Sequence, residues 1–266
     1  MNVSIYTSIF NAISNNFDYK KSIDNFCKFV GMDGEVVVAV NDSNDDTLYF
    51  VKLLSNNYPQ LKVVESHFSY GDNTFDGGIK NVALQHCDNK YPLKIQMDMD
   101  EIIPLNQKKL WIEYGKGLLD SEYQALFIPS IDLYGDIKHI RKNHTIGQKW
   151  RIHKNGLKRG VWERARLDNG LFNTSLSDSG ELLSQDNQLV YTANIISNEL
   201  LSPFNTSKLN NFPFTLHYGF LDLERRANLG KNFWKEKWEQ RSGKQENVAT
   251  SIEELQEETI EHNLIF

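Results

Sequence analysis

Residues 93–104 read LKIQMDMDEIIP, and this stretch decides the class of fold. Leu93, Ile95 and Met97 alternate with polar residues, which predicts a β-strand. Asp98 and Asp100 follow two residues apart, so both carboxylates can face the same side of the sheet. Together with ligand oxygens they would suit a hard divalent cation. Two aspartates at this spacing also occur in solvated turns that bind no metal. The surrounding sequence must therefore distinguish a metal site from such a turn.

The chain before this stretch alternates strand-like and helix-like segments. Apolar spacing predicts strands over 3–9, 35–40 and 61–64, and helices over 19–30, 48–54 and 79–86. The run at 35–40 is continuously apolar, which is typical of a strand covered on both faces. This order predicts a largely parallel sheet with right-handed crossovers.

Polar residues follow three of the four predicted strands. They are Thr7-Ser8, Asn41-Asp42-Ser43 and Asp98-Met99-Asp100-Glu101. Ligands of such sheets bind beyond the carboxyl ends of the strands. The three clusters therefore predict one binding site at that edge.

The second half is less regular. Strands are predicted over 123–133, 149–154 and 160–167, and a helix over 223–238. Residues 169–211 are rich in Ser, Asn and Asp, which predicts loops with one strand near 188–193.

Composition and charge exclude several classes of function. The formal net charge is −6, which argues against a nucleic-acid partner. No apolar run reaches the roughly 18 residues of a membrane span. The N-terminus lacks the basic leader of a signal peptide, and Cys27 and Cys87 fit buried reduced thiols, so we expect a cytoplasmic protein.

Four segments, in order, resemble family 2 of the glycosyltransferases. They are Thr7–Asn11, Ser43–Thr47, Gly78–Leu84 and Asp98–Glu101, the last at the position of the family's Asp-x-Asp motif. The turn after the second strand is shorter than usual and lacks its glycine. The matching pieces span roughly residues 3–104 in the expected order.

The second half resembles the family 2 enzymes that build lipopolysaccharide-type glycans. The matching segments are Arg151–Lys154, Asn155-Gly156, Val161-Trp162-Glu163, His217-Tyr218-Gly219 and Glu224-Arg225-Arg226. Trp162 stands where a histidine is more usual.

The resemblance implies a GT-A fold, an α/β architecture with a Rossmann-like, mostly parallel central sheet flanked by helices. Residues 1–104 would be the nucleotide-sugar-binding half. Residues 105–266 would form an irregular, β-containing and helical acceptor side of the same domain. The implied activity is metal-dependent transfer of a hexosyl or hexuronosyl group from a UDP-sugar to a glycan or other hydroxyl acceptor, with inversion.

The resemblance also implies roles for single residues. Thr7, Ser8 and Asp42 would contact the uracil and ribose, and Lys80 would place a fixed positive charge near the nucleotide. At the implied metal site, Asp98 would contact the ribose or a water on the metal, Asp100 would bind the metal directly, and His217 would complete the metal shell. An imidazole among carboxylates favours Mn²⁺ over Mg²⁺. Each of these residues also has an alternative role. Asp42 would cap the following helix, Lys80 would be a solvated helix residue, and His217 would be a hydrogen-bonded core histidine.

Glu163 is the implied general base, which would take the proton of the acceptor hydroxyl. An ion pair with Arg151, Arg164 or Arg166 is the alternative role. Asp132, Asp136 and Glu181 are the next candidates for the base.

Two other functions stay open from the sequence. A metal-dependent nucleotidyltransferase also uses paired carboxylates, but it normally needs a third acidic ligand and a triphosphate site. A catalytically inactive GT-A-like module would bind the nucleotide sugar only. The basic residues Lys149, Arg151, Lys154, Lys158 and Arg159 would suit an acidic sugar, or form a solvated strand face.

Overall fold

The computed structural model describes residues 2–68, 75–141, 146–159, 182–183, 192–197, 200–203, 206–224, 227 and 259–264. The chain forms two compact units. The first comprises Met1–Ile128 with Gln148–Ile195, and the second comprises Pro129–Gly147 with Ile196–Ile265. The division predicted at residue 104 separates a donor-binding half from an acceptor side, whereas these units are defined by their compactness. The predicted division stays a prediction.

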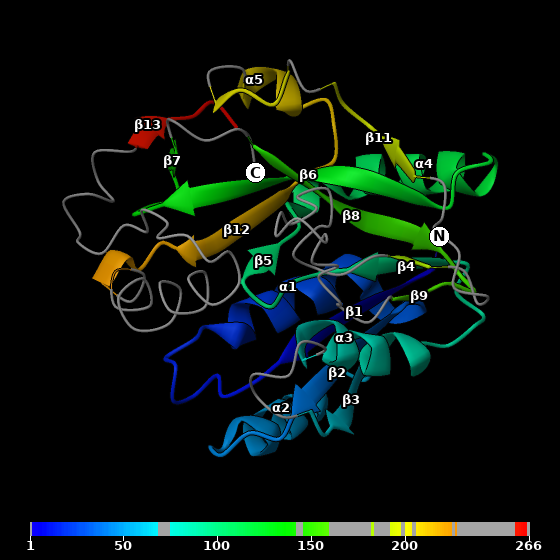
Figure 1. The fold of residues 1–266 in the computed structure, drawn as a ribbon, viewed down its shortest axis with the longest axis vertical. Helices are drawn as coiled ribbons and strands as arrows, with labels where there is room; N and C mark the ends of the chain where they lie inside the picture. Colours follow the sequence, from blue (N-terminus) through cyan, green and yellow to red (C-terminus); the bar gives the residue numbers. More distant parts are fainter. Residues whose placement is uncertain are drawn as a thin grey trace, which may run out of the picture. The chain divides into compact units, whose positions relative to one another are not determined.

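The first unit is built on a mostly parallel sheet. Its strands β1 (Val3–Ile9), β2 (Glu35–Asn41), β3 (Leu61–Ser66) and β4 (Leu93–Gln96) run parallel in the order β3-β2-β1-β4 (Figure 1). Strand β8 (Gly147–Lys154) continues the sheet antiparallel to β4. The predicted α/β class with a mostly parallel central sheet is therefore confirmed.

Among the described residues of the first unit, four helices accompany this sheet. They are α1 (Tyr19–Val30), α2 (Thr47–Ser55), α3 (Phe75–Gln85) and α4 (Lys108–Leu119), with 3₁₀ turns at Gly31–Asp33 and Leu105–Gln107. Helix α1 begins where the Asp18 carboxylate accepts a hydrogen bond from Lys21 N. Its residues Ile23 and Phe26 are fully buried, so one stripe of the helix packs on the sheet.

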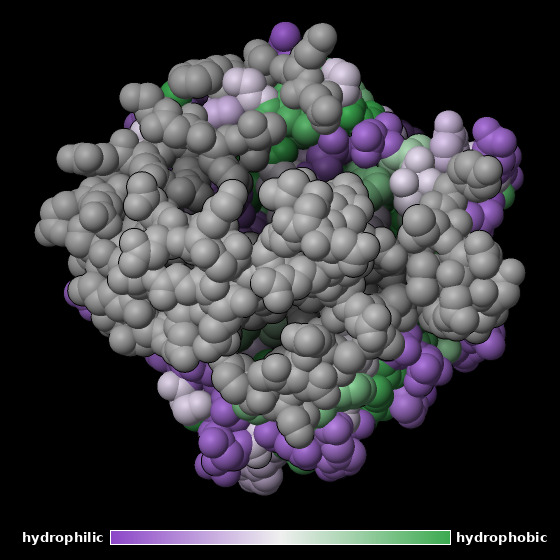
Figure 2. Space-filling view, in the orientation of Figure 1, coloured by the Kyte–Doolittle hydropathy of each residue, from purple (hydrophilic) through white to green (hydrophobic). Residues whose placement is uncertain are grey.

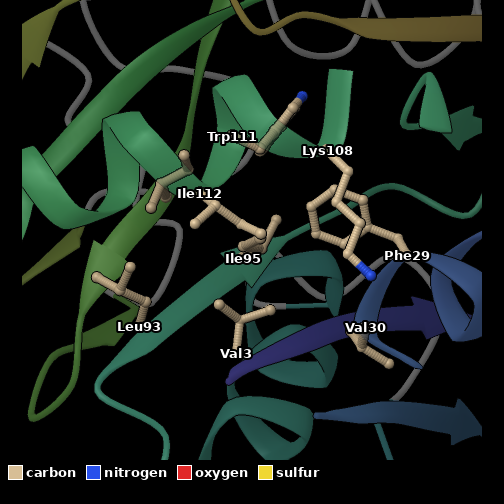
Figure 3. Close-up of a pocket in the computed structure, with 9 residues that line it drawn as sticks. Val3, Phe29, Val30, Leu93, Ile95, Lys108, Trp111 and Ile112 are labelled. Atoms are coloured by element: carbon tan, nitrogen blue, oxygen red, sulfur yellow. The ribbon is translucent and has the colours of Figure 1, made fainter. Parts of the chain in front are cut away.

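One face of the sheet is apolar. Ile5, Ile95 and Ile152 pack there against residues of α1 and α4 in one continuous core. A cavity of about 10 Å³ remains between this face and the two helices (Figure 3). Figure 3 shows apolar side chains such as Leu93 and Trp111 around it. A space this small and apolar is a gap in packing rather than a ligand site.

The other face carries polar side chains along β4 and β8. Tyr6 Oη lies 3.0 Å from His153 Nε2, and both residues are fully buried. The buried Lys94 Nζ donates to Ser4 Oγ at 3.2 Å and to the carbonyl of Asp88 at 2.6 Å. Polar groups on this face thus satisfy one another, as buried groups must.

Strand β6 (Ala125–Tyr134) begins in the first unit and ends in the second. In the first unit, β11 (Thr192–Asn194) runs parallel to the beginning of β6. This unit also contains three short strands, β5 (Glu101–Ile102), β9 (Lys158–Arg159) and β10 (Leu182–Leu183). In the second unit, β12 (Thr215–Phe220) runs parallel to the end of β6. There β7 (His139–Arg141) pairs antiparallel with both β6 and β13 (Thr259–Glu261), and α5 spans Thr206–Leu209.

The second half was predicted less well than the first. The strands expected at 123–133 and 149–154 are present as β6 and β8, and part of the strand expected at 188–193 is β11. Among the described residues, the elements α4, β7, β12 and β13 were not predicted, nor were the short elements β5, β9, β10 and α5. The strand expected at 160–167 and most of the helix expected at 223–238 lie outside the described residues.

Across the part of the chain that the structure describes, no helix combines the length and apolar character of a membrane span. Figure 2 shows hydrophilic residues gathered at the end of the first unit where α2 and β3 lie in Figure 1. An exposed ion pair of 2.6 Å between Lys52 of α2 and Glu65 of β3 lies there.

Candidate active site

The loops that follow β1 and β2 are joined by hydrogen bonds. Asn11 N donates to Ser43 Oγ at 3.1 Å, and Asn44 N donates to Asn11 Oδ1 at 2.9 Å. Ala12 N donates to Thr47 Oγ1 at 2.8 Å. Asn11 has φ 46°, a left-handed conformation that asparagine tolerates better than most residues. Two segments that resemble family 2 motifs therefore meet at the carboxyl ends of neighbouring strands.

Asp45 fixes the start of α2. Its carboxylate accepts hydrogen bonds from Ser14 N at 2.8 Å, Ser14 Oγ at 2.9 Å and Thr47 N at 2.9 Å. Burial alone would raise the pKa of Asp45, but the hydrogen bonds from Ser14 and Thr47 lower it below its usual value. Asp45, rather than Asp42, thus provides the hydrogen bond to the first turn of α2.

The residues expected to contact the base differ in accessibility. Thr7 is fully buried, and its Oγ1 has no hydrogen-bond partner among the described residues. Ser8 is half-buried, and Asp42 is exposed at the end of β2. Asp42 Oδ1 lies 2.6 Å from Nδ1 of His67, which follows β3. Of the three, Ser8 and Asp42 therefore have side chains that a ligand can reach.

Asp98, two residues after the end of β4, lies at the centre of a cluster of charges. Its Oδ1 accepts from Lys80 Nζ at 2.6 Å and from Gln96 Nε2 at 3.0 Å. Its Oδ2 accepts from Lys149 Nζ at 2.9 Å and from Arg151 Nη2 at 2.8 Å. A carboxylate offers about four lone-pair sites, so these four hydrogen bonds saturate it.

Glu101 is the second carboxylate of the cluster and is fully buried. It forms ion pairs with Arg151 and, at 3.2 Å, with Lys149. Its Oε2 also accepts from the backbone N of Asp98 at 3.1 Å. Arg151 donates as well to Gln96 Oε1, so one guanidinium holds three neighbours. We call Lys80, Asp98, Glu101, Lys149 and Arg151 the charge cluster.

The pKa values of Asp98, Lys149 and Arg151 are shifted so that each group stays in its charged form. Burial would raise the pKa of Asp98, but Lys149, Lys80 and Arg151 hold it well below its usual range. Burial would lower the pKa of Lys149, but Asp98 and Glu101 raise it above its usual range. The pKa of Arg151 is likewise raised, by Glu101 and Asp98 against the effect of burial. The three groups are therefore ionised at neutral pH.

A pH dependence of stability follows from the lowered pKa of Asp98. Its stabilisation is fully present above the unfolded pKa of about 3.9 and is lost as the pH falls through the folded value. The raised pKa of Lys149 adds no acid dependence, because its stabilisation is present below about pH 10.4. We expect Asp98→Asn to lose less stability than the wild type between about pH 5 and pH 2.

Urea unfolding at a series of pH values measures this difference, with Asp33→Asn, at an exposed carboxylate, as the matched control. The control should follow the wild-type curve. Equal acid sensitivity of Asp98→Asn and the wild type would contradict the role given to Asp98.

Sequence reasoning placed Glu101 beside Asp98 at the predicted site, but it missed Gln96 and did not connect Lys149 and Arg151 with these carboxylates. The available signal was the alternation of Lys149, Arg151 and His153 along one strand, which places all three on the same face. The basic run is not one patch, because Lys154 Nζ donates instead to the carbonyl of Ser121 at 2.7 Å. Lys158 and Arg159 lie in β9.

His217 belongs to the second unit and lies in β12, and the described residues 223, 224 and 227 after this strand are helical. It is paired in register with Asp132 of β6, and its Nδ1 is 2.7 Å from Asp132 Oδ1. Asp100 is half-buried in the turn after β4. Among the described residues, no group of three or more His, Cys, Asp or Glu side chains is arranged to hold a metal ion. Glu163 lies outside the described residues.

No family model matches this chain, and no curated protein matches it in sequence. Among solved structures it resembles S. aureus TarS 1–349, with a TM-score of 0.45 and 16% identity over 92% of this chain and 76% of that chain. The same protein in complex with UDP-GlcNAc gives a TM-score of 0.43 and 13% identity over 90% and 73%. The mannosyltransferase PcManGT from Pyrobaculum calidifontis, in complex with GDP-Man and Mn²⁺, gives a TM-score of 0.40. Its sequence identity is 16% over 57% of this chain and 44% of that chain. Similarity this low leaves the function to be argued from the residues of the site.

Proposed function

We propose that this chain is a glycosyltransferase that moves a hexosyl or hexuronosyl group from a UDP-sugar to a hydroxyl acceptor, with inversion. One observation carries the proposal. The motif-bearing loops after β1 and β2 are hydrogen-bonded to each other, and the charge cluster lies after β4 at the same edge of a parallel sheet. Ligands of such sheets bind at that edge.

The donor would be held by residues of the first unit. Ser8 and Asp42 would contact the uridine, because their side chains are accessible at the ends of β1 and β2. Thr7 would support this end of β1 from within the core, since its side chain is fully buried. Lys80 and Asp98 would support the ribose and diphosphate side of the site from within the protein, as a preformed ion pair.

The proposed Mn²⁺ site fits some of its expected ligands better than others. Asp98 fits poorly, because both of its oxygens are already saturated by four donors. Asp100 is the remaining carboxylate of the motif. His217 fits a metal ligand, because a carboxylate on one ring nitrogen is the usual support of a metal-binding histidine. A metal bound by Asp100 would offset the charge of the leaving diphosphate.

Glu163 stays the proposed general base. Its carboxylate would take the proton from the acceptor hydroxyl while that oxygen forms a bond to the anomeric carbon. The bond from the anomeric carbon to the diphosphate oxygen breaks in the same step, and UDP leaves with the electron pair. Attack from the face opposite the leaving group inverts the anomeric centre.

Nucleotide-sugar binding tests the proposal directly. We expect UDP to raise the melting temperature of the chain, and a panel of UDP-sugars with Mn²⁺ to include at least one that is slowly hydrolysed to UDP. Adenosine and guanosine diphosphates serve as controls for the base. Absence of any stabilisation by UDP, with or without Mn²⁺, would refute the assignment.

The same assay separates the other two functions. An inactive binding module would be stabilised by a UDP-sugar but would release no UDP on prolonged incubation. A nucleotidyltransferase would instead release pyrophosphate from UTP and a sugar phosphate.

A further inference from the structure

We infer that Lys149 binds the diphosphate of the nucleotide donor, moving from the carboxylates of the charge cluster onto the phosphate oxygens. The inference rests on the proposed function and assigns a new residue to its site. Lys149 is the third residue of β8, and β8 runs antiparallel to β4. The start of β8 therefore lies at the carboxyl end of β4, where ligands of parallel sheets bind.

The charges of the cluster favour an anion. The cluster contains three cations, Lys80, Lys149 and Arg151, and two carboxylates, Asp98 and Glu101. The five residues together therefore carry one positive charge in excess. An approaching diphosphate is more highly charged than either carboxylate, so it competes well for a lysine that can reach it.

Exposure identifies which of the three cations can reach a ligand. The side chain of Lys149 is 32% exposed, whereas those of Lys80 and Arg151 are 6% and 0% exposed. Lysine carries a compact charge on a flexible stem, so its ammonium group can move by several ångströms without a change in the backbone. Lys149 is thus the accessible cation of the cluster.

The carboxylates do not depend on Lys149. When its ammonium group leaves, Asp98 keeps its hydrogen bonds from Lys80, Gln96 and Arg151. Glu101 keeps its ion pair with Arg151 and its hydrogen bond from a backbone N–H. The usual penalty for leaving a buried carboxylate unpaired is therefore avoided. Arg151 and Lys80 hold the cluster together while Lys149 binds the ligand.

The test compares affinities for uridine, UMP and UDP in the presence of excess chelator, so that no metal contributes. For the wild type we expect affinity to rise from uridine to UDP. For Lys149→Met we expect UDP binding to weaken by about 10–100-fold and uridine binding to change less than about twofold, because one charge-assisted phosphate contact is lost. Lys149→Arg should recover part of the UDP affinity.

Lys154→Met is the matched control, since Lys154 lies on the same strand but donates to the Ser121 carbonyl. It should leave the affinities for uridine and UDP unchanged. If Lys149→Met melts too low for binding measurements, Lys149→Gln removes the charge while keeping hydrogen-bond donors.

Three results would overturn the inference. They are an equal loss of uridine and UDP affinity in Lys149→Met, an unchanged UDP affinity in that variant, and a wild type that gains no affinity from uridine to UDP without metal. Failure of the wild type to bind either uridine or UDP under any condition would refute the proposed function instead.

Discussion

Replacing Arg151 with methionine is expected to lower the free energy of unfolding by about 3–5 kcal/mol, because it leaves the fully buried Glu101 carboxylate without its closest ion-pair partner. Arg151 is fully buried and contacts Asp98, Glu101 and Gln96. Methionine has a similar length but offers no donor. For a chain of this size the corresponding fall in melting temperature is about 6–20 °C.

Two further variants separate charge from packing. Arg151→Lys keeps the charge but cannot hold two carboxylates with one planar fork, so we expect an intermediate loss. Arg151→Met combined with Glu101→Gln removes the unpaired charge and should recover part of the stability. A loss below about 1 kcal/mol in Arg151→Met, the size typical of an exposed ion pair, would show that the cluster is not a structural anchor.

Glu163→Gln is expected to reduce glycosyl transfer by about 10²–10⁴-fold, the usual contribution of a positioned general base. Glutamine keeps the size of the side chain but cannot accept the acceptor's proton. UDP affinity should stay within about twofold of the wild type, because the base contacts the acceptor and not the diphosphate. Transfer rates and calorimetric UDP titrations measure the two quantities separately.

Asp100→Asn provides the contrast, since we expect it to lose metal-dependent UDP binding together with rate. Turnover of Glu163→Gln within about threefold of the wild type would move the base elsewhere. Asp132 would not be the first replacement to test, because it is engaged with His217. Asp136 and Glu181 would come before it.

The first half of the fold could be predicted because its signals are local. The continuous apolar run of β2 and the apolar stripe of α1 can each be recognised from a few neighbouring residues of the sequence. Helix α4 was missed because its interior contains Gly115 and Gly117, which lower helix propensity, and because few of its residues are buried.

Only the part of the site that follows the ends of the predicted strands, and the helix residue Lys80 implied by the resemblance, were predicted. Lys80 and Asp98 were both singled out, and the structure joins them by an ion pair of 2.6 Å. The partnership of Asp98 with Arg151 could not be predicted, because it depends on β8 pairing antiparallel with β4 across more than fifty residues of intervening chain. The roles of Thr7, Ser8, Asp42, Asp100, His217 and Glu163 stay predictions.

The pairing of β8 with β4 has a consequence for how this gene can tolerate insertions and deletions. Lys149 and Arg151 face Asp98 because they occupy alternate positions of one strand. Deletion of the single codon for Trp150 would make Lys149 and Arg151 neighbours, so one of them would move to the opposite face of the sheet. Length changes in the segment before Gly147 would leave that alternation intact. Variation in length among descendants of this gene should therefore accumulate before β8 and be absent within it.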